Sequence, residues 1–113
     1  MNILCVPYGS EHQQAVRVGD TLRILVSAPQ DGNTWAGNVT IKETLSGSAV
    51  DDTALAEYTG EKVAGRQWSL SVDYDTSTIP LVANTRYVAI AEVTSGTKKR
   101  EFHTVFNVLP QGR

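Results

Sequence analysis

Apolar and polar residues alternate along most of the chain, which is the pattern of strands that bury one face. The stretch 21–28 is typical, because Leu22, Ile24 and Val26 share one face. No segment keeps the period of about 3.6 residues that an amphipathic helix needs. Alternating stretches predict about seven strands, at 15–20, 21–28, 38–45, 54–60, 66–74, 81–96 and 98–109, with loops at 29–34 and 46–53. The stretch 54–60 also fits a short helical turn, although a weak strand is preferred. This succession predicts an all-β fold, an antiparallel β-sandwich.

The strand that contains Tyr87 departs from the alternation, since it is apolar on both faces. If Tyr87 faces the core, Val88 and Ile90 face away from it. In the last strand Phe106 is expected to face the core, which turns Val105 outward. We therefore expect Val88, Ile90 and Val105 to form an outward patch that binds a partner or a second copy. Isolated exposed aliphatic residues are also common on strands, so the patch has an ordinary alternative explanation.

The first 14 residues differ from the rest of the chain, because a short apolar run is followed by polar residues without a period. We interpret residues 1–14 as an extended N-terminal arm and residues 15–113 as the sandwich domain. Ile3, Leu4, Val6 and Tyr8 are the arm residues expected to contact a partner. One hypothesis is that the arm adds a strand to the open sheet edge of a neighbouring subunit. Another is that it folds back over Val88 and Ile90.

Composition narrows the classes of function. The chain has 113 residues and a net charge of −2 at neutral pH, which argues against a nucleic-acid-binding protein. Cys5 is the single cysteine and cannot form an internal disulfide. The apolar run near the N-terminus is too short for a signal peptide or a membrane span. We expect neither nucleic acid nor membrane as a partner.

The titratable residues do not match a catalytic or metal-binding motif. Asp51 and Asp52 are adjacent in an expected loop, but they lack the spacing of a calcium-binding loop and are interpreted as turn residues. We therefore expect no catalytic residue, no metal and no cofactor. Lys98, Lys99 and Arg100 form a basic run near an expected hairpin tip. This run is either a solvated turn or a contact with an acidic partner surface.

The segment 81–87, Leu-Val-Ala-Asn-Thr-Arg-Tyr, resembles the tyrosine corner of fibronectin-type and immunoglobulin-like sandwiches. The resemblance implies that Tyr87 is buried and that its hydroxyl bonds to the chain a few residues upstream. Asn84 stands where that pattern usually has Gly, and Asn tolerates a left-handed backbone. Trp68 and Phe106 are expected in the core with Tyr87. The chain has no cysteine pair, and Trp68 lies later than the conserved tryptophan of immunoglobulin domains, so the resemblance implies the architecture only.

Residues 18–110 are similar in the order of their segments to small Ig-like proteins and modules of tailed-phage virions. The segments are a Gly-Asp turn before an alternating strand, an Asp-Gly loop, a Val-Thr-Ile-Lys strand, the tyrosine-bearing strand and a closing Phe-x-Val-x-Pro. This resemblance implies a capsid decoration or cement protein that binds the major capsid protein or other virion subunits. It also implies a homo-oligomer that is made in the host cytoplasm and located in the virion, at the head in preference to the tail.

Two alternatives to decoration remain open. One is a tail or baseplate connector, which belongs to the same structural class. The other is a carbohydrate-binding or adhesion module, which would present exposed aromatic side chains. Trp35, Tyr58 and Tyr74 are the candidates for such a surface, although Trp35 fits equally well as a plug at one end of the sandwich.

Overall fold

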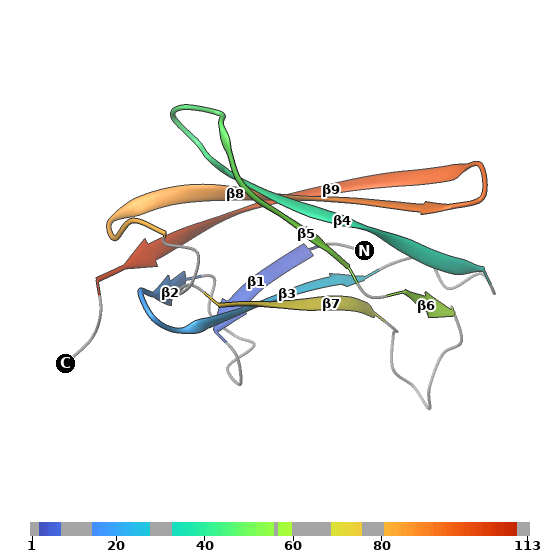
Figure 1. Cartoon of the computed structure of the whole chain (residues 1–113), viewed down its shortest axis with the longest axis horizontal. Coiled ribbons are helices and arrows are strands. Elements are labelled where there is room, and N and C mark those ends of the chain that lie inside the picture. Colours follow the sequence, from blue (N-terminus) through green and yellow to red (C-terminus); the bar gives the residue numbers. More distant parts are fainter. Residues whose placement is uncertain are drawn as a thin grey trace.

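Strands are the only regular elements in the described part of the computed structural model (Figure 1). The structure describes residues 3–7, 15–27, 33–55, 57–59, 69–75 and 81–110. The strands are β1 (Ile3–Pro7), β2 (Ala15–Arg17), β3 (Thr21–Ser27), β4 (Thr34–Glu43), β5 (Ala49–Ala54), β6 (Tyr58–Thr59), β7 (Ser69–Asp75), β8 (Thr85–Ser95) and β9 (Lys98–Leu109). Within these ranges no helix is long and apolar enough to cross a membrane.

The strands form two sheets that lie in separate layers (Figure 1). The smaller sheet has the order β1-β3-β7, and the larger sheet has the order β2-β9-β8-β4-β5, with β6 paired to β4. Neighbouring strands are antiparallel, except that β2 runs parallel to β9. The predicted all-β sandwich is therefore confirmed.

The core lies between the two sheets and consists of the inward residues of the alternating strands. Tyr87 and Phe106 face each other across β8 and β9, and their rings stack with centroids 5.9 Å apart. The buried hydrophobic residues include Leu22, Ile24, Val26, Trp35, Val39, Ile41, Leu70, Tyr74, Tyr87, Ala89, Ala91, Val93, Phe102, Phe106 and Val108. Trp68, which was predicted in the core, lies outside the described residues.

The tyrosine corner has the geometry that the sequence predicted. The side chain of Tyr87 is 2% exposed, and its hydroxyl oxygen accepts a hydrogen bond of 2.8 Å from the backbone N–H of Val82. Asn84 has a φ of 61°, in the left-handed region that Asn adopts more readily than most residues. These two features support the start of β8 and define the direction in which its side chains point.

The N-terminal segment differs from the expected arm. The backbone of Ile3–Pro7 forms β1 and pairs with β3 over five positions, so this part of residues 1–14 belongs to the smaller sheet. An apolar run beside an open strand edge completes that sheet by ladder hydrogen bonds within its own chain. Tyr8 lies outside the described residues.

The prediction of a loop at 46–53 is wrong for its second half, because Ala49–Ala54 forms β5. β5 pairs only with β4 and forms an edge of the larger sheet. Its side chains are exposed or half-buried, so the segment lacks the alternation of apolar residues that identifies a strand. With β1, it brings the described strands to nine, against about seven expected.

Candidate interaction surface on the open face of the larger sheet

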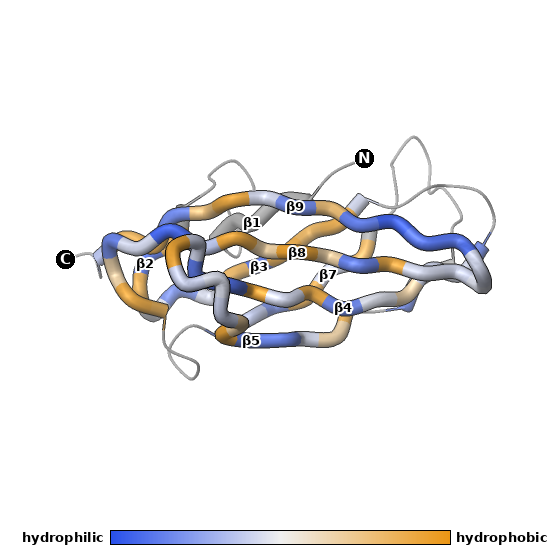
Figure 2. Tube along the Cα trace, turned by 90° about the horizontal axis from the view of Figure 1, so that it is seen from above, coloured by the Kyte–Doolittle hydropathy of each residue, from blue (hydrophilic) through white to orange (hydrophobic). Residues whose placement is uncertain are grey.

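The outer face of the larger sheet carries the residues that the sequence predicted to point outward. Val88 lies directly opposite Val105, and Ile90 lies directly opposite His103, in the pairing of β8 with β9. Val105 is 46% exposed, and Val88 and Ile90 are half-buried. The predicted outward placement of the three aliphatic residues is therefore confirmed. Figure 2, which looks onto this sheet, shows how much of β8 is apolar compared with the hydrophilic first part of β9.

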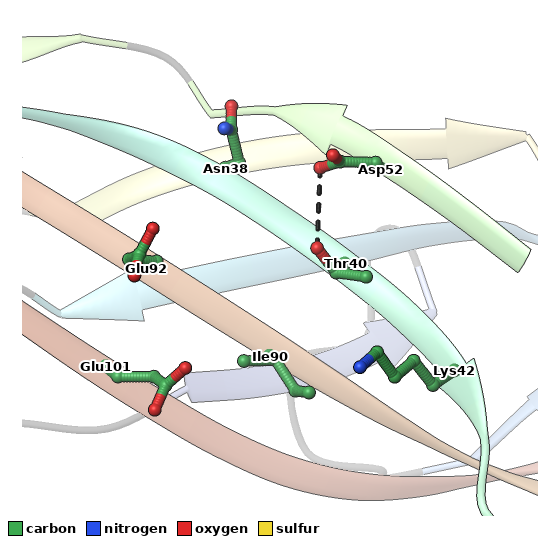
Figure 3. Close-up of a pocket in the computed structure, with 7 residues that line it drawn as sticks. All are labelled: Asn38, Thr40, Lys42, Asp52, Ile90, Glu92 and Glu101. Atoms are coloured by element: carbon green, nitrogen blue, oxygen red, sulfur yellow. Dashed lines mark hydrogen bonds between the residues drawn. The ribbon is translucent and has the colours of Figure 1, made fainter. Parts of the chain in front are cut away.

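A shallow hollow of about 280 Å³ lies on the same face, beside the aliphatic residues (Figure 3). Its lining residues come from β4, β5, β8 and β9 and are Asn38, Thr40, Lys42, Asp52, Ile90, Glu92 and Glu101. The Thr40 hydroxyl lies 3.4 Å from a carboxylate oxygen of Asp52, within hydrogen-bond distance. Figure 3 shows Ile90 between Glu92 and Glu101 at one end and Lys42 at the other. The hollow therefore combines one aliphatic side chain with charged groups of both signs.

Two carboxylates face each other directly across β8 and β9. Glu92 and Glu101 form a cross-strand pair, an arrangement in which like charges repel. Each has one nitrogen-bearing neighbour: the Lys99 ammonium nitrogen Nζ lies 3.3 Å from Glu92, and the imidazole Nε2 of His103 lies 3.3 Å from Glu101. All four side chains are about half exposed or more, so water screens these contacts and they stabilise the fold little. The pair leaves a region of negative charge at this end of the face.

The basic run is divided by the alternation of the strand. Lys98, Lys99 and Arg100 all belong to β9 and are exposed. Lys99 lies on the outer face with Glu92, whereas the guanidinium of Arg100 lies 5.5 Å from the ring centroid of Phe102, a core residue. The structure therefore does not bring the three cations together as one patch.

The expected arm residues do not lie on this face. The backbone of Ile3, Leu4 and Val6 lies in β1, at the edge of the smaller sheet, where they pair with Val26, Leu25 and Arg23. Folding back over Val88 and Ile90 is therefore not what this segment does. Pairing with a neighbouring subunit would require an edge other than the one already bound to β3.

Three exposed aliphatic residues were not predicted from the sequence, and one of them, Val50 of β5, is 38% exposed. Leu45 is 96% exposed at the turn between β4 and β5, and Val82 is 61% exposed just before β8. Backbone hydrogen bonds between Glu43 and Gly47 and between Glu43 and Ser48 define the turn. Leu45 also lines a hollow of about 370 Å³ with Asn84, Thr85 and Arg86. The signal in the sequence was a lone leucine among threonine, serine and glycine, residues that form turns.

Two of the three aromatic candidates for carbohydrate binding are buried. Trp35 is 2% exposed and Tyr74 is 3% exposed, so neither presents a ring to solvent. Burial, followed by the nearby charge of Asp51, raises the pKa of Tyr74 from 10.0 to about 12. The side chain of Tyr58 lies outside the described part of the structure. Trp35 therefore packs in the sandwich, which was the alternative that the sequence left open for it.

Acidic side chains can serve as metal ligands or as partners of cations within the fold. Over the described ranges, no group of three or more His, Cys, Asp and Glu side chains is arranged to hold a metal ion. Asp73 on β7 faces Arg23 on β3, and two hydrogen bonds of 2.9 and 3.1 Å join them. These bonds with Arg23 hold the pKa of Asp73 below its usual value.

The fold and this open sheet face define an all-β sandwich with an exposed face of mixed apolar and charged character. No protein-family model, curated protein or solved structure matches the chain.

Proposed function

We propose that this chain is a non-enzymatic structural protein that acts by binding other protein subunits. Within that class we propose a virion protein of a tailed phage, a capsid decoration protein that attaches to the major capsid protein and reinforces the head. The order of segments in residues 18–110, which is similar to Ig-like virion proteins, supports the phage assignment. The assignment of the sandwich to the Ig-like group is part of the same proposal.

The outward pair Val88 and Val105, with Ile90 beside it, is the observation that carries the proposal. These side chains occupy the middle of an open sheet face, where a strand of an isolated domain usually has polar residues. Burying aliphatic surface contributes about 25 cal/mol per Å². Leu45, held out by a turn of defined shape, provides a second apolar contact. A surface with two such contacts suits a protein that bridges subunits.

The alternatives differ in how much supports them. A tail or baseplate connector would use the same surfaces, and only its location in the virion distinguishes it. A carbohydrate-binding module is the weaker alternative, because Trp35 and Tyr74 are buried.

Immunogold labelling of phage particles from the source, viewed by negative-stain microscopy, tests the proposal. We expect gold in regular excess over the heads. Gold confined to tails would identify the connector instead, and the absence of gold from every particle would overturn both virion assignments. We also expect the double variant Val88→Lys, Ile90→Lys to fold but not to assemble, because its charges oppose burial of this face. The variant Val82→Lys adds a charge away from the face and is the control.

A further inference from the structure

Charges and apolar residues follow a definite order along the outer face of β8 and its neighbours. The cross-strand pairs of β8 and β9 run from Glu92 with Glu101, through Ile90 with His103 and Val88 with Val105, to Arg86 with Asn107. In β4, Thr40 stands beside Ile90 and Lys42 beside Val88. In β5, Asp52 stands beside Thr40. The carboxylates of Glu92, Glu101 and Asp52 therefore lie toward one end of the face, where Lys99 pairs with Glu92, and the cations Lys42 and Arg86 lie toward the other end, with the aliphatic residues between them.

The two cations Lys42 and Arg86 have no carboxylate partner among the residues that the structure describes. Lys42 points into the hollow of Figure 3 and forms no ion pair there. Arg86 is exposed, and its Nε donates a weak hydrogen bond of 3.4 Å to the Asn107 side chain. Both cations are thus available to carboxylates from another molecule.

We infer that two copies of this chain pair through this face, related by a two-fold axis that crosses β8 at the level of Ala89. Such an axis lies between the two faces and reverses the strand direction, so each copy presents its cationic end to the carboxylate end of the other. Val88 then packs on the second copy's Ile90, and Arg86 meets the second copy's Glu92. Lys42 comes beside the second copy's Asp52. The face is self-complementary, as an isologous interface requires.

The choice of a second copy as the occupant follows from this complementarity. With the axis at Ala89, Val88 and Ile90 form an aliphatic contact, and Arg86 with Glu92 and Lys42 with Asp52 bring opposite charges together. A stable dimer usually buries about 800 Å² on each partner, and three aliphatic side chains supply only part of that area. We therefore expect a weak dimer, with a dissociation constant in the micromolar range. This pairing rests on the proposed function in one respect: it assumes that the face of Val88, Ile90 and Val105 binds protein subunits, and it names a second copy as that subunit.

Analytical ultracentrifugation of two single variants, separately and mixed, tests the pairing. In Arg86→Glu, the substituted carboxylate would face the second copy's Glu92, and in Glu92→Arg two guanidinium groups would face each other. We expect each variant alone to associate at least ~10-fold more weakly than the wild type, because like charges at an interface cost several kcal/mol. An equimolar mixture should recover wild-type affinity, because a mixed pair joins opposite charges at both contacts.

The controls separate pairing from folding. Lys98→Glu and Glu57→Arg make the same charge changes at exposed residues outside this face and should leave association unchanged. Circular dichroism establishes that each variant is folded, and Lys42→Asp with Asp52→Lys provides a second pair for the mixing experiment if either fails. A monomeric wild type, or a mixture that stays as weakly associated as its components, would overturn the inference. Dimers in solution without gold on particles would overturn the proposed function and leave the pairing intact.

Discussion

At the scale of single residues, the tyrosine corner is the clearest link between sequence and stability. The Tyr87 hydroxyl satisfies the N–H of Val82, five residues upstream, while the ring stacks on Phe106. Replacing Tyr87 by Phe keeps the ring and removes the acceptor, which leaves a partly buried donor unpaired. We expect the free energy of unfolding to fall by about 1–3 kcal/mol, measured by urea denaturation.

A control for this measurement comes from the same corner. Position 84 requires a left-handed backbone, which Gly also adopts without steric cost. Asn84→Gly should therefore change the unfolding free energy by less than about 1 kcal/mol. An unchanged urea midpoint in Tyr87→Phe would show that the hydroxyl bond does not stabilise the fold.

Tyr74 gives the fold a sensitivity to alkaline pH. Its pKa is raised to about 12 in the folded chain, mainly by burial, so the folded state resists losing this proton. The stabilisation is fully present below the unfolded pKa of 10.0 and is lost as the pH rises from there through about 12. We expect the melting temperature of the wild type to fall over this range more steeply than that of Tyr74→Phe, measured by circular dichroism. Parallel curves for the two proteins would contradict this assignment.

At the scale of strands, β1 determines how the N-terminal residues contribute. Its five backbone positions pair with β3, so removal of residues 1–7 would leave that edge of β3 without its ladder partner. We expect the truncated chain to melt more than about 5 °C lower, since a loss of 1 kcal/mol shifts a domain of this size by about that amount.

A peptide of residues 1–7 added to the truncated chain should restore part of the lost melting temperature, because it can pair again with β3. The hypothesis of an arm that laces onto a neighbour makes the opposite prediction, namely attachment lost and melting unchanged. Unchanged melting would therefore favour lacing.

The strands that the sequence predicted are those with one buried face. In β3 and β9 the alternation of apolar residues is imposed by the core, so it predicted these strands and the outward direction of Val105. β8 is apolar on both faces, and the outward direction of Val88 was predicted from the placement of Tyr87 in the core. β5 and β1 were not predicted as strands of the sandwich. An edge strand is defined by its backbone pairing with a neighbour, and the sequence of one segment does not show which segment it pairs with. For the same reason, which charged residues lie next to Ile90 on the neighbouring strands could be determined only from the register of β4, β8 and β9. Leu45 could not be assigned as exposed, because its exposure depends on the hydrogen bonds of the turn.

At the scale of the whole molecule, the proposed pairing and the exposed turn fit together. The backbone N–H of Thr44 donates to the carbonyl of Arg86, so the turn that carries Leu45 lies at the basic end of the face. A two-fold axis that reverses the strands places the two Leu45 turns at opposite ends of the dimer. Such a dimer presents two separated apolar contacts, and the second contact forms more readily once the first has formed.

The position of β9 has a consequence for the order of events during protein synthesis. β9 lies between β8 and β2, and β2 pairs through Ala15 with Asn107 and through Arg17 with Leu109. When the ribosome has translated the chain only up to Ser95, β2 has no partner in the larger sheet and β8 can pair only with β4. Joining residues so distant in sequence is slow, on a timescale of about milliseconds to seconds. Until then, the growing chain exposes apolar strands that chaperones recognise, and a ribosome stalled before β9 would yield a fragment for proteolysis and not a smaller version of the protein.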